Sequence, residues 1–211
     1  MVTFLFTILL VSVAEALTPL PLRFRVRRFE RSDLKHIADL AEAEFTNPTD
    51  GNMIRSLFRF QISLGFEMRL AMFESTEGSD HAVFVLSDDM GSIGGLIEIS
   101  KQPKWLAGPA PMLPPPPKLK KLLPDLEPYI SNILVDPNFR REGFGSDLMR
   151  MCHLQCLEWG YDTCYLDVDA EDEGAIGFYE AMNYKTCRQD PKWVKYLRGF
   201  RLRRMKKQLD R

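Results

Sequence analysis

Apolar and polar residues follow two different periods along this chain of 211 residues, and these periods predict its first elements. Residues 24–29 alternate between apolar and basic side chains, which indicates a strand with one face in solvent. Apolar residues recur at helical spacing over residues 34–45 and 53–64, which predicts two helices. The apolar runs 82–86 and 93–100 flank an Asp-Asp-Met-Gly turn, which is typical of a β-hairpin.

The second predicted helix has a stripe of large apolar side chains, made up of Met53, Leu57, Phe60 and Leu64. Residues at this spacing lie on one face of a helix. We favour packing of this face in the core as its interpretation. For the helix before it, Ser32 is the expected N-cap residue.

The second half of the chain has the pattern of alternating strands and helices. It predicts strand 129–135, helix 145–159, strand 164–169, helix 173–182 and two final strands at 184–188 and 200–209. A helix that connects two consecutive strands makes them parallel, so the first two of these strands form a parallel pair. The final two strands are expected to complete the sheet in antiparallel orientation.

Residues 102–128 interrupt this order with a proline-rich insertion that includes the basic residues Lys118, Lys120 and Lys121. Proline removes a backbone donor, so neither a helix nor a central strand is expected here. The insertion is interpreted as a loop beside an acceptor groove or as a ligand for a protein partner. The basic C-terminal tail, from Lys192 onward, is interpreted either as a solvated edge strand or as a surface that attracts acidic partners.

The N-terminus has the pattern of a cleaved leader. Residues 2–13 are almost wholly apolar and too few to span a bilayer, and Ala14-Glu15-Ala16 is a small-x-small cleavage site. We therefore predict a signal peptide at 1–16, a leader remnant at 17–22 and a single domain at 23–211. The basic, acid-free stretch that follows resembles a bipartite presequence and predicts a plastid. Secretory lumen, or cytoplasm if the leader is no signal, remain the alternatives, and no membrane association is expected of the mature form.

Composition limits the classes of partner. A formal net charge of −1 gives no reason to expect a nucleic-acid partner. Four cysteines, Cys152, Cys156, Cys164 and Cys187, lack zinc spacing, so we predict free thiols and no metal site.

A basic loop with two glycines follows the strand at 129–135. Its sequence is Arg140-Arg141-Glu142-Gly143-Phe144-Gly145-Ser146, and it opens the next predicted helix. The first N–H groups of a helix have no intrahelical partner and carry partial positive charge. Glycine lets the main chain approach a ligand closely, so the loop is predicted to bind a pyrophosphate.

A second motif, residues 168–184, contains Asp172, Ala175, Phe178-Tyr179 and Asn183 at fixed spacing. Together with Arg140-x-x-Gly143-x-Gly145, it resembles the GNAT superfamily of acyl-CoA-dependent N-acetyltransferases, including plastid-type protein N-acetyltransferases. The resemblance implies an α/β GNAT fold, in which a mixed central sheet of about seven strands has a splayed parallel pair and flanking helices. Asp172 replaces the usual asparagine. Asn183 replaces the usual glycine, a mild change at a left-handed helix cap.

The resemblance also implies a cosubstrate and its binding residues. Acetyl-CoA would be bound by Ile133, Leu134, Val135, Arg140, Arg141, Glu142, Gly143, Phe144, Gly145, Ser146 and Asp172. Tyr179 would be the general acid that protonates the CoA thiolate, since a phenol is protonated at neutral pH. The general base stays open among Glu98, Glu127 and Asp167.

The sequence therefore predicts an N-acetyltransferase that moves an acetyl group from acetyl-CoA to a protein or peptide amine, by direct attack on the thioester. The absence of an evident strong base favours α-amines slightly over lysine, because an α-amine needs less help to lose its proton. The alternatives are acetylation of a small amine such as a polyamine, or a non-catalytic CoA-binding module.

Overall fold

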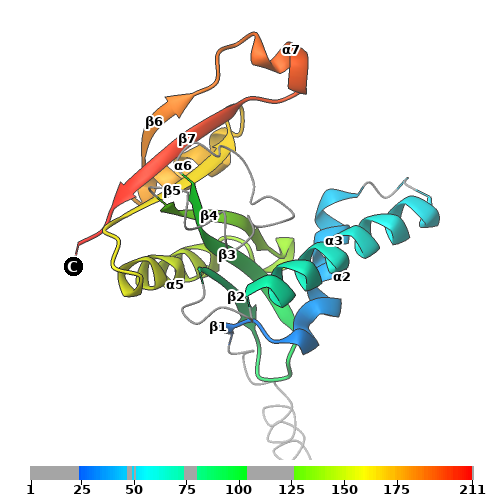
Figure 1. Ribbon diagram of the computed structural model, residues 1–211. Coiled ribbons are helices and arrows are strands. Elements are labelled where there is room, and N and C mark those ends of the chain that lie inside the picture. Colours follow the sequence, from blue (N-terminus) through cyan, green and yellow to red (C-terminus); the bar gives the residue numbers. More distant parts are fainter. Residues whose placement is uncertain (1–23, 47–48, 50, 74–79, 104–125, 211) are drawn as a thin grey trace, which may run out of the picture.

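The computed structural model describes residues 24–46, 49, 51–73, 80–103 and 126–210 (Figure 1). In chain order the elements are β1 (Arg25–Arg28), the 3-10 helix η1 (Arg31–Asp33), α2 (Leu34–Phe45), α3 (Asn52–Phe73), β2 (His81–Ser87), β3 (Ile93–Pro103), β4 (Leu126–Val135), η2 (Pro137–Phe139), α5 (Phe144–Glu158), β5 (Thr163–Asp169), α6 (Glu173–Ala181), β6 (Lys185–Gln189), α7 (Val194–Arg198) and β7 (Leu202–Gln208). The predicted leader, residues 1–22, lies outside the described residues.

Seven strands form one sheet in the order β1-β2-β3-β4-β5-β7-β6. β4 and β5 are parallel, and each other neighbouring pair is antiparallel. This confirms the predicted α/β fold with one parallel pair. α5 packs on one face of β2, β3 and β4, while α2 lies against β3 and against α3 (Figure 1).

Alternate side chains of the strands supply two cores, one on each face of the sheet, as the period of two in a strand requires. On β2, Phe84 and Leu86 belong to the cluster beneath α5, whereas Val83 and Val85 belong to the cluster beneath α2 and α3. Val85 is completely buried. The sheet is therefore covered on both faces at β2, β3 and β4.

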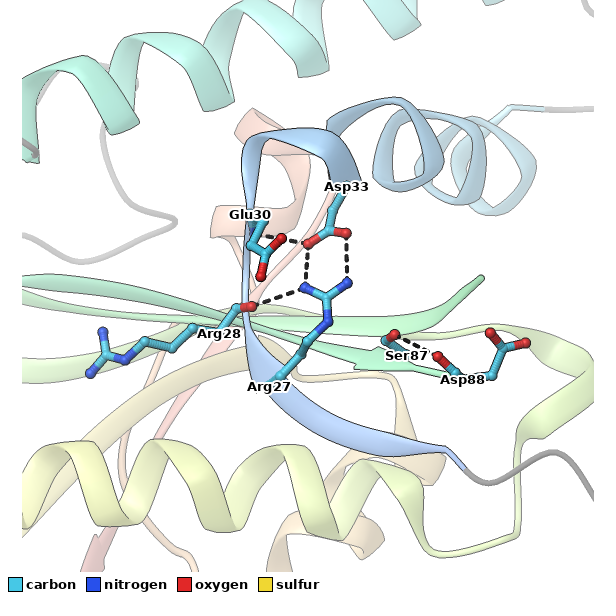
Figure 2. A network of polar contacts seen from close by, with 6 residues as sticks. All are labelled: Arg27, Arg28, Glu30, Asp33, Ser87 and Asp88. Atoms are coloured by element: carbon cyan, nitrogen blue, oxygen red, sulfur yellow. Dashed lines mark hydrogen bonds and ion pairs between the residues drawn. The ribbon is translucent and has the colours of Figure 1, made fainter. Parts of the chain in front are cut away.

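A partly buried ion pair fixes the turn from β1 into α2 (Figure 2). Arg27 donates from Nη1 and Nη2 to the two carboxylate oxygens of Asp33, at 2.7 and 2.8 Å, and the Glu30 N–H donates to the same carboxylate at 2.8 Å. Burial alone would raise the pKa of Asp33, but the hydrogen bonds from Arg27 and Glu30 hold it below its usual value. Ser32 lies inside η1, so the prediction that it caps the helix is wrong.

The stripe on α3 is exposed, so the predicted core packing is wrong. Met53, Leu57, Phe60 and Leu64 are 82%, 65%, 63% and 46% exposed. A second apolar face of the same helix packs on the core instead, through Phe58, Ile62 and Phe66. α3 also continues well beyond the predicted end at residue 64.

The two ends of the proline-rich segment belong to the sheet. Gln102 pairs with Glu127 and Pro103 with Leu126, so the expectation of no central strand anywhere in 102–128 is wrong at both ends. The part from 104 to 125, including the three lysines, lies outside the described residues.

The last strand, β7, lies between β5 and β6 and pairs with both. The interpretation of the basic tail as an edge strand is therefore wrong, and the edge is β6, whose residues are all exposed. Asn183 has a φ of 66° just after α6, which confirms the predicted left-handed cap. No helix in the described part of the chain is both long and apolar enough to cross a membrane.

Candidate active site

The centre of the sheet contains a bulge on β4. Leu96 of β3 pairs with Leu134, but Glu98 pairs with Ser131, so β4 has one extra residue between these pairs. Asn132 takes up the extra length with a φ of 52°, a conformation that asparagine tolerates better than most residues. A bulge bends its strand, and this one turns β4 away from β5.

As a result, β4 and β5 pair through only two positions, Tyr129 with Tyr165 and Ile130 with Leu166. β4 then continues to Val135 and β5 to Asp169 with no ladder between them, which leaves a gap. Ile133 and Val135 are half-buried on the α5 side, whereas Leu134 is buried in the core beneath α2 and α3. Main-chain groups on this side of β4 therefore have no ladder partner on β5 beyond Ile130.

The glycine loop lies at the N-terminus of α5, next to the end of β4. Gly143 is the N-cap residue with a φ of 90°, and no side chain caps the helix. Among the described residues, none accepts a hydrogen bond from the main-chain N–H groups of residues 141–145. These donors and the helix dipole suit an anion, so the loop fits a pyrophosphate.

The charged residues of this loop have different tasks. Arg140 donates from Nε to the Val135 carbonyl at 2.9 Å and forms an ion pair with Glu44 of α2 at 2.7 Å. Arg141 has a φ of 70° and no ion pair with any described residue, so its guanidinium is available to a ligand. Glu142 is exposed and Ser146 is half-buried.

Helix α6 packs beside this loop. A Cβ on Gly145 would lie 3.3 Å from Cζ of Phe178, and Phe144 packs edge-on against Phe24. Asp172 is the N-cap of α6 and accepts from the Ala175 N–H at 2.9 Å. One oxygen of the carboxylate is thus engaged in the helix cap.

Tyr179 is buried on α6, with its ring against Phe178 and Tyr184. Burial, together with the charge of Asp172, raises its pKa to about 12. Within the described part of the chain its hydroxyl has no hydrogen-bond partner. The phenol is therefore protonated at neutral pH and free to donate.

On the opposite face of the sheet, a polar triad spans the start of the gap. Tyr129 donates to Asp167 at 3.2 Å, and Arg204 of β7 donates to the same carboxylate from Nε and Nη2 at 3.0 and 3.1 Å. Burial and the neighbouring carboxylate raise the pKa of the Tyr129 phenol. Asp167 is the first residue of β5 beyond its last pair with β4, so its carboxylate lies where the gap opens.

The three carboxylates considered as general bases have different surroundings. Glu98 is fully buried behind the bulge, with His81 Nε2 at 2.5 Å and Asn132 Nδ2 at 2.7 Å. Glu127 is half-buried beside Tyr165, whose phenol forms a hydrogen bond with it. Asp167 lines a cavity of about 350 Å³ that also includes Trp193, Leu197 and Arg204.

The cysteines are free thiols, as predicted. Cys152, Cys156 and Cys164 are buried and Cys187 is exposed. No group of three or more potential metal ligands occurs within the described ranges.

The model of the acetyltransferase (GNAT) family matches residues 39–184, which contain the bulge, the glycine loop and Tyr179. The chain belongs to this family. Its sequence is 29% identical over 66 residues to GCN5-related N-acetyltransferase 10, chloroplastic, of Arabidopsis thaliana. That match covers 31% of this chain and 26% of the relative.

Solved structures of low sequence identity share the fold. The putative acetyltransferase yncA of Salmonella typhimurium, solved with acetyl-CoA, is 15% identical with a TM-score of 0.55, over 90% of this chain and 95% of the other. Naa20 of Chaetomium thermophilum, in complex with a bisubstrate analogue, is 21% identical with a TM-score of 0.56, over 88% and 86%. At these identities the likeness shows the GNAT fold.

The structure brings most of the sequence-derived site residues together. Residues 133–135 border the gap, residues 140–146 form the adjoining loop, and Asp172 and Tyr179 lie on the helix beside that loop. Sequence reasoning missed Tyr129 and Arg204. The signal that could have found them is the alternation of side chains along a strand. Tyr129 precedes the core residue Ile130 and Arg204 precedes the core residue Met205, so both side chains lie on the opposite face of the sheet.

Proposed function

We propose that the protein transfers the acetyl group of acetyl-CoA to an amine of a protein or peptide. The observation that carries this proposal is the gap between β4 and β5, which leads directly to the uncapped N-terminus of α5. An acyl-CoA has the shape that such a site requires, with a long amide-bearing arm and a pyrophosphate at its end. The acetyl-CoA in the Salmonella structure of the same fold supports the choice of cosubstrate.

In this proposal the chain holds the cosubstrate by its main chain. N–H groups of residues 141–145 bind the pyrophosphate, together with the side chains of Arg141 and Ser146. Main-chain groups of residues 133–135 bind the pantetheine arm, and one N–H faces the thioester carbonyl. A donor placed in advance at a developing oxyanion is worth about 3 kcal/mol in such reactions.

Tyr179 donates a proton to the departing thiolate. Its pKa of about 12 keeps the phenol protonated, and its hydroxyl is not engaged by any described residue. A thiolate becomes a far better leaving group when a proton reaches it as the bond breaks.

Asp167 binds the acceptor amine and takes up its proton. Arg204 and Tyr129 hold the carboxylate in one orientation at the mouth of the gap. An α-amine, with a pKa near 8, needs only this modest assistance, whereas a lysine amine near 10.4 costs about 3 kcal/mol more to deprotonate. The arrangement favours the α-amine.

An acceptor comparison tests this function. Purified protein and acetyl-CoA are incubated with peptides that have a free α-amine, with N-terminally blocked peptides that contain lysine, and with spermidine. We expect the highest kcat/KM for the free α-amine. Faster acetylation of spermidine would favour the polyamine alternative, and CoA binding with no transfer to any amine would favour the non-catalytic one.

We also propose that residues 1–16 are a signal peptide and that the following basic stretch directs the protein to a plastid. The chloroplastic relative in Arabidopsis supports this location. The test is a fusion of residues 1–28 to a fluorescent protein in an alga with a secondary plastid. Fluorescence in the plastid is the expected result. Secretion would leave only the signal peptide, and cytosolic fluorescence would contradict both assignments.

A further inference from the structure

The pocket beside Asp167 is built by β5, β6, β7 and α7, and it opens on the face of the sheet opposite α5. Its volume of about 350 Å³ is in the lower range of ligand pockets, enough for one or two amino-acid side chains. Trp193, Leu197 and Leu202 form its apolar wall. Because Asp167 lines this pocket and also lies at the gap, a ligand whose amine reaches the gap places its next atoms over the pocket.

Arginines dominate the charge of the pocket. Arg204 is already engaged by Asp167, and Asp190 accepts from the Leu202 N–H at 3.1 Å. The guanidinium groups of Arg188 and Arg198, which also line the pocket, have no hydrogen bond or ion pair with any described residue. Within the described part of the chain, neither guanidinium is paired with a carboxylate, although Asp190 also lines the pocket.

We propose that Arg188 and Arg198 select acceptors with an aspartate or glutamate side chain within two residues of the α-amine. The inference rests on the proposed function and names its substrate class. A guanidinium matches a carboxylate with two parallel hydrogen bonds. The same groups repel an acceptor with lysine or arginine at these positions.

The size of the expected preference for an acidic peptide follows from the strength of a guanidinium–carboxylate contact. Hydrogen bonds to charged groups correspond to roughly ten- to a hundredfold in kcat/KM. Because the pocket is open to solvent, the lower end of this range is expected, with a steady decline as salt is added.

The test uses three peptides that differ only at the second residue, which is aspartate, alanine or lysine. We expect the native protein to acetylate the aspartate peptide about ten times faster than the alanine peptide in kcat/KM, and the lysine peptide slowest. Arg198→Glu and Arg188→Glu should each shift the preference toward lysine. The conservative variants Arg188→Gln and Arg198→Gln should each weaken the preference without reversing it.

Lys192→Glu is the matched control, because it makes the same change of charge in the same segment at an exposed residue that does not line the pocket. It should keep the native order of the three peptides. CoA affinity, measured by calorimetry, should be unchanged in all variants, which shows that each is folded.

Two results overturn the inference. Equal rates for the three peptides, or an unchanged preference in both Arg188→Glu and Arg198→Glu, would remove the two arginines from acceptor selection while peptide acetylation itself stands. If folded, CoA-binding protein acetylates no peptide at all, the proposed function falls and the acceptor preference falls with it. The two failures are distinguishable by whether any peptide product forms.

Discussion

The helices α3 and α5 have similar apolar periodicity but opposite surroundings. On α5, Leu148, Met149, Cys152 and Cys156 are completely buried against the sheet. On α3, the stripe from Met53 to Leu64 faces outward, and the inward face is a second set of apolar residues. Periodicity therefore identifies an apolar face, but a helix with two such faces does not reveal which one the chain covers.

The two helices also differ in how they are fastened. α5 is held by apolar burial, whereas α2 and α3 are joined in part by charge. Arg55 and Arg59 of α3 reach the buried Glu42 of α2 at 2.6 and 3.2 Å. Glu44 of α2 in turn pairs with Arg140, so α2 and α3 are linked to the glycine loop.

The largest effect should come from Gly145, in the first turn of α5, where the loop packs closely against α6. Gly145→Glu would place a carboxylate in the proposed anion site, and its Cβ would already crowd the Phe178 ring at 3.3 Å. We expect loss of measurable CoA binding by calorimetry.

The control is Gly51→Glu, the same substitution just before α3, where a Cβ meets nothing within 4 Å. It should bind CoA with native affinity. A folded Gly145→Glu protein with unchanged affinity would show that the loop does not hold the pyrophosphate.

Tyr179→Phe should lower kcat by roughly 10²–10⁴-fold with little change in CoA affinity, the usual range for loss of a general acid. The reason is that the phenol is the proton donor in the proposed reaction. Because its pKa is raised to about 12, the donor stays protonated over the neutral and mildly alkaline range, so it should cause no fall of kcat there.

Tyr184→Phe is the matched control. Its hydroxyl is engaged by His153 at 2.9 Å and Cys164 at 3.1 Å, so its loss should reduce stability and not kcat. Near-native turnover of Tyr179→Phe, under conditions where chemistry limits the rate, would remove Tyr179 from the mechanism.

A pair of leucine truncations measures the contrast between the two helices directly. Leu148→Ala should lower the free energy of unfolding by about 2–5 kcal/mol, because it leaves a cavity in a closed core. Leu57→Ala, at 65% exposure, should stay within about 0.5 kcal/mol. Urea denaturation of both variants is the measurement, and equal losses would mean that the α3 stripe is covered in solution.

The smallest effect should come from the Arg27–Asp33 ion pair, which holds the turn from β1 into α2. The Asp33 carboxyl has a lowered pKa in the folded protein, so its ionised form stabilises the fold above its unfolded value near 3.8. Asp33→Asn should therefore cost about 1.5 kcal/mol at pH 7. The difference in free energy of unfolding between the variant and the native protein should shrink as the pH falls below about 3.8, through the lowered pKa of Asp33. A difference that does not depend on pH would argue against the ion pair.

The sequence allowed the fold class, the parallel pair and the position of the glycine loop to be predicted, because each depends on local pattern. The gap could not be located from pattern alone. It depends on the register of β4 against β3, and a run such as Ile-Ser-Asn-Ile-Leu-Val is compatible with several registers. The assignment of Tyr179 as the acid stays a prediction.

The acceptor side was harder to predict because its parts are distant in the sequence. Asp167 meets Tyr129 and Arg204 across 38 and 37 positions. Arg204 in particular was one of many basic residues in the tail. Only the insertion of β7 between β5 and β6 singles it out.

That insertion has a consequence for synthesis on the ribosome. β6 leaves the ribosome before β7, so during translation neither β5 nor β6 can find its final neighbour. Two unpaired edges, one of them backed by the core residues Leu166 and Val168, are open until Leu202 to Gln208 emerge. A nascent chain stalled before Leu202 should be a substrate for chaperones, and release of the last strand should close both edges in one step.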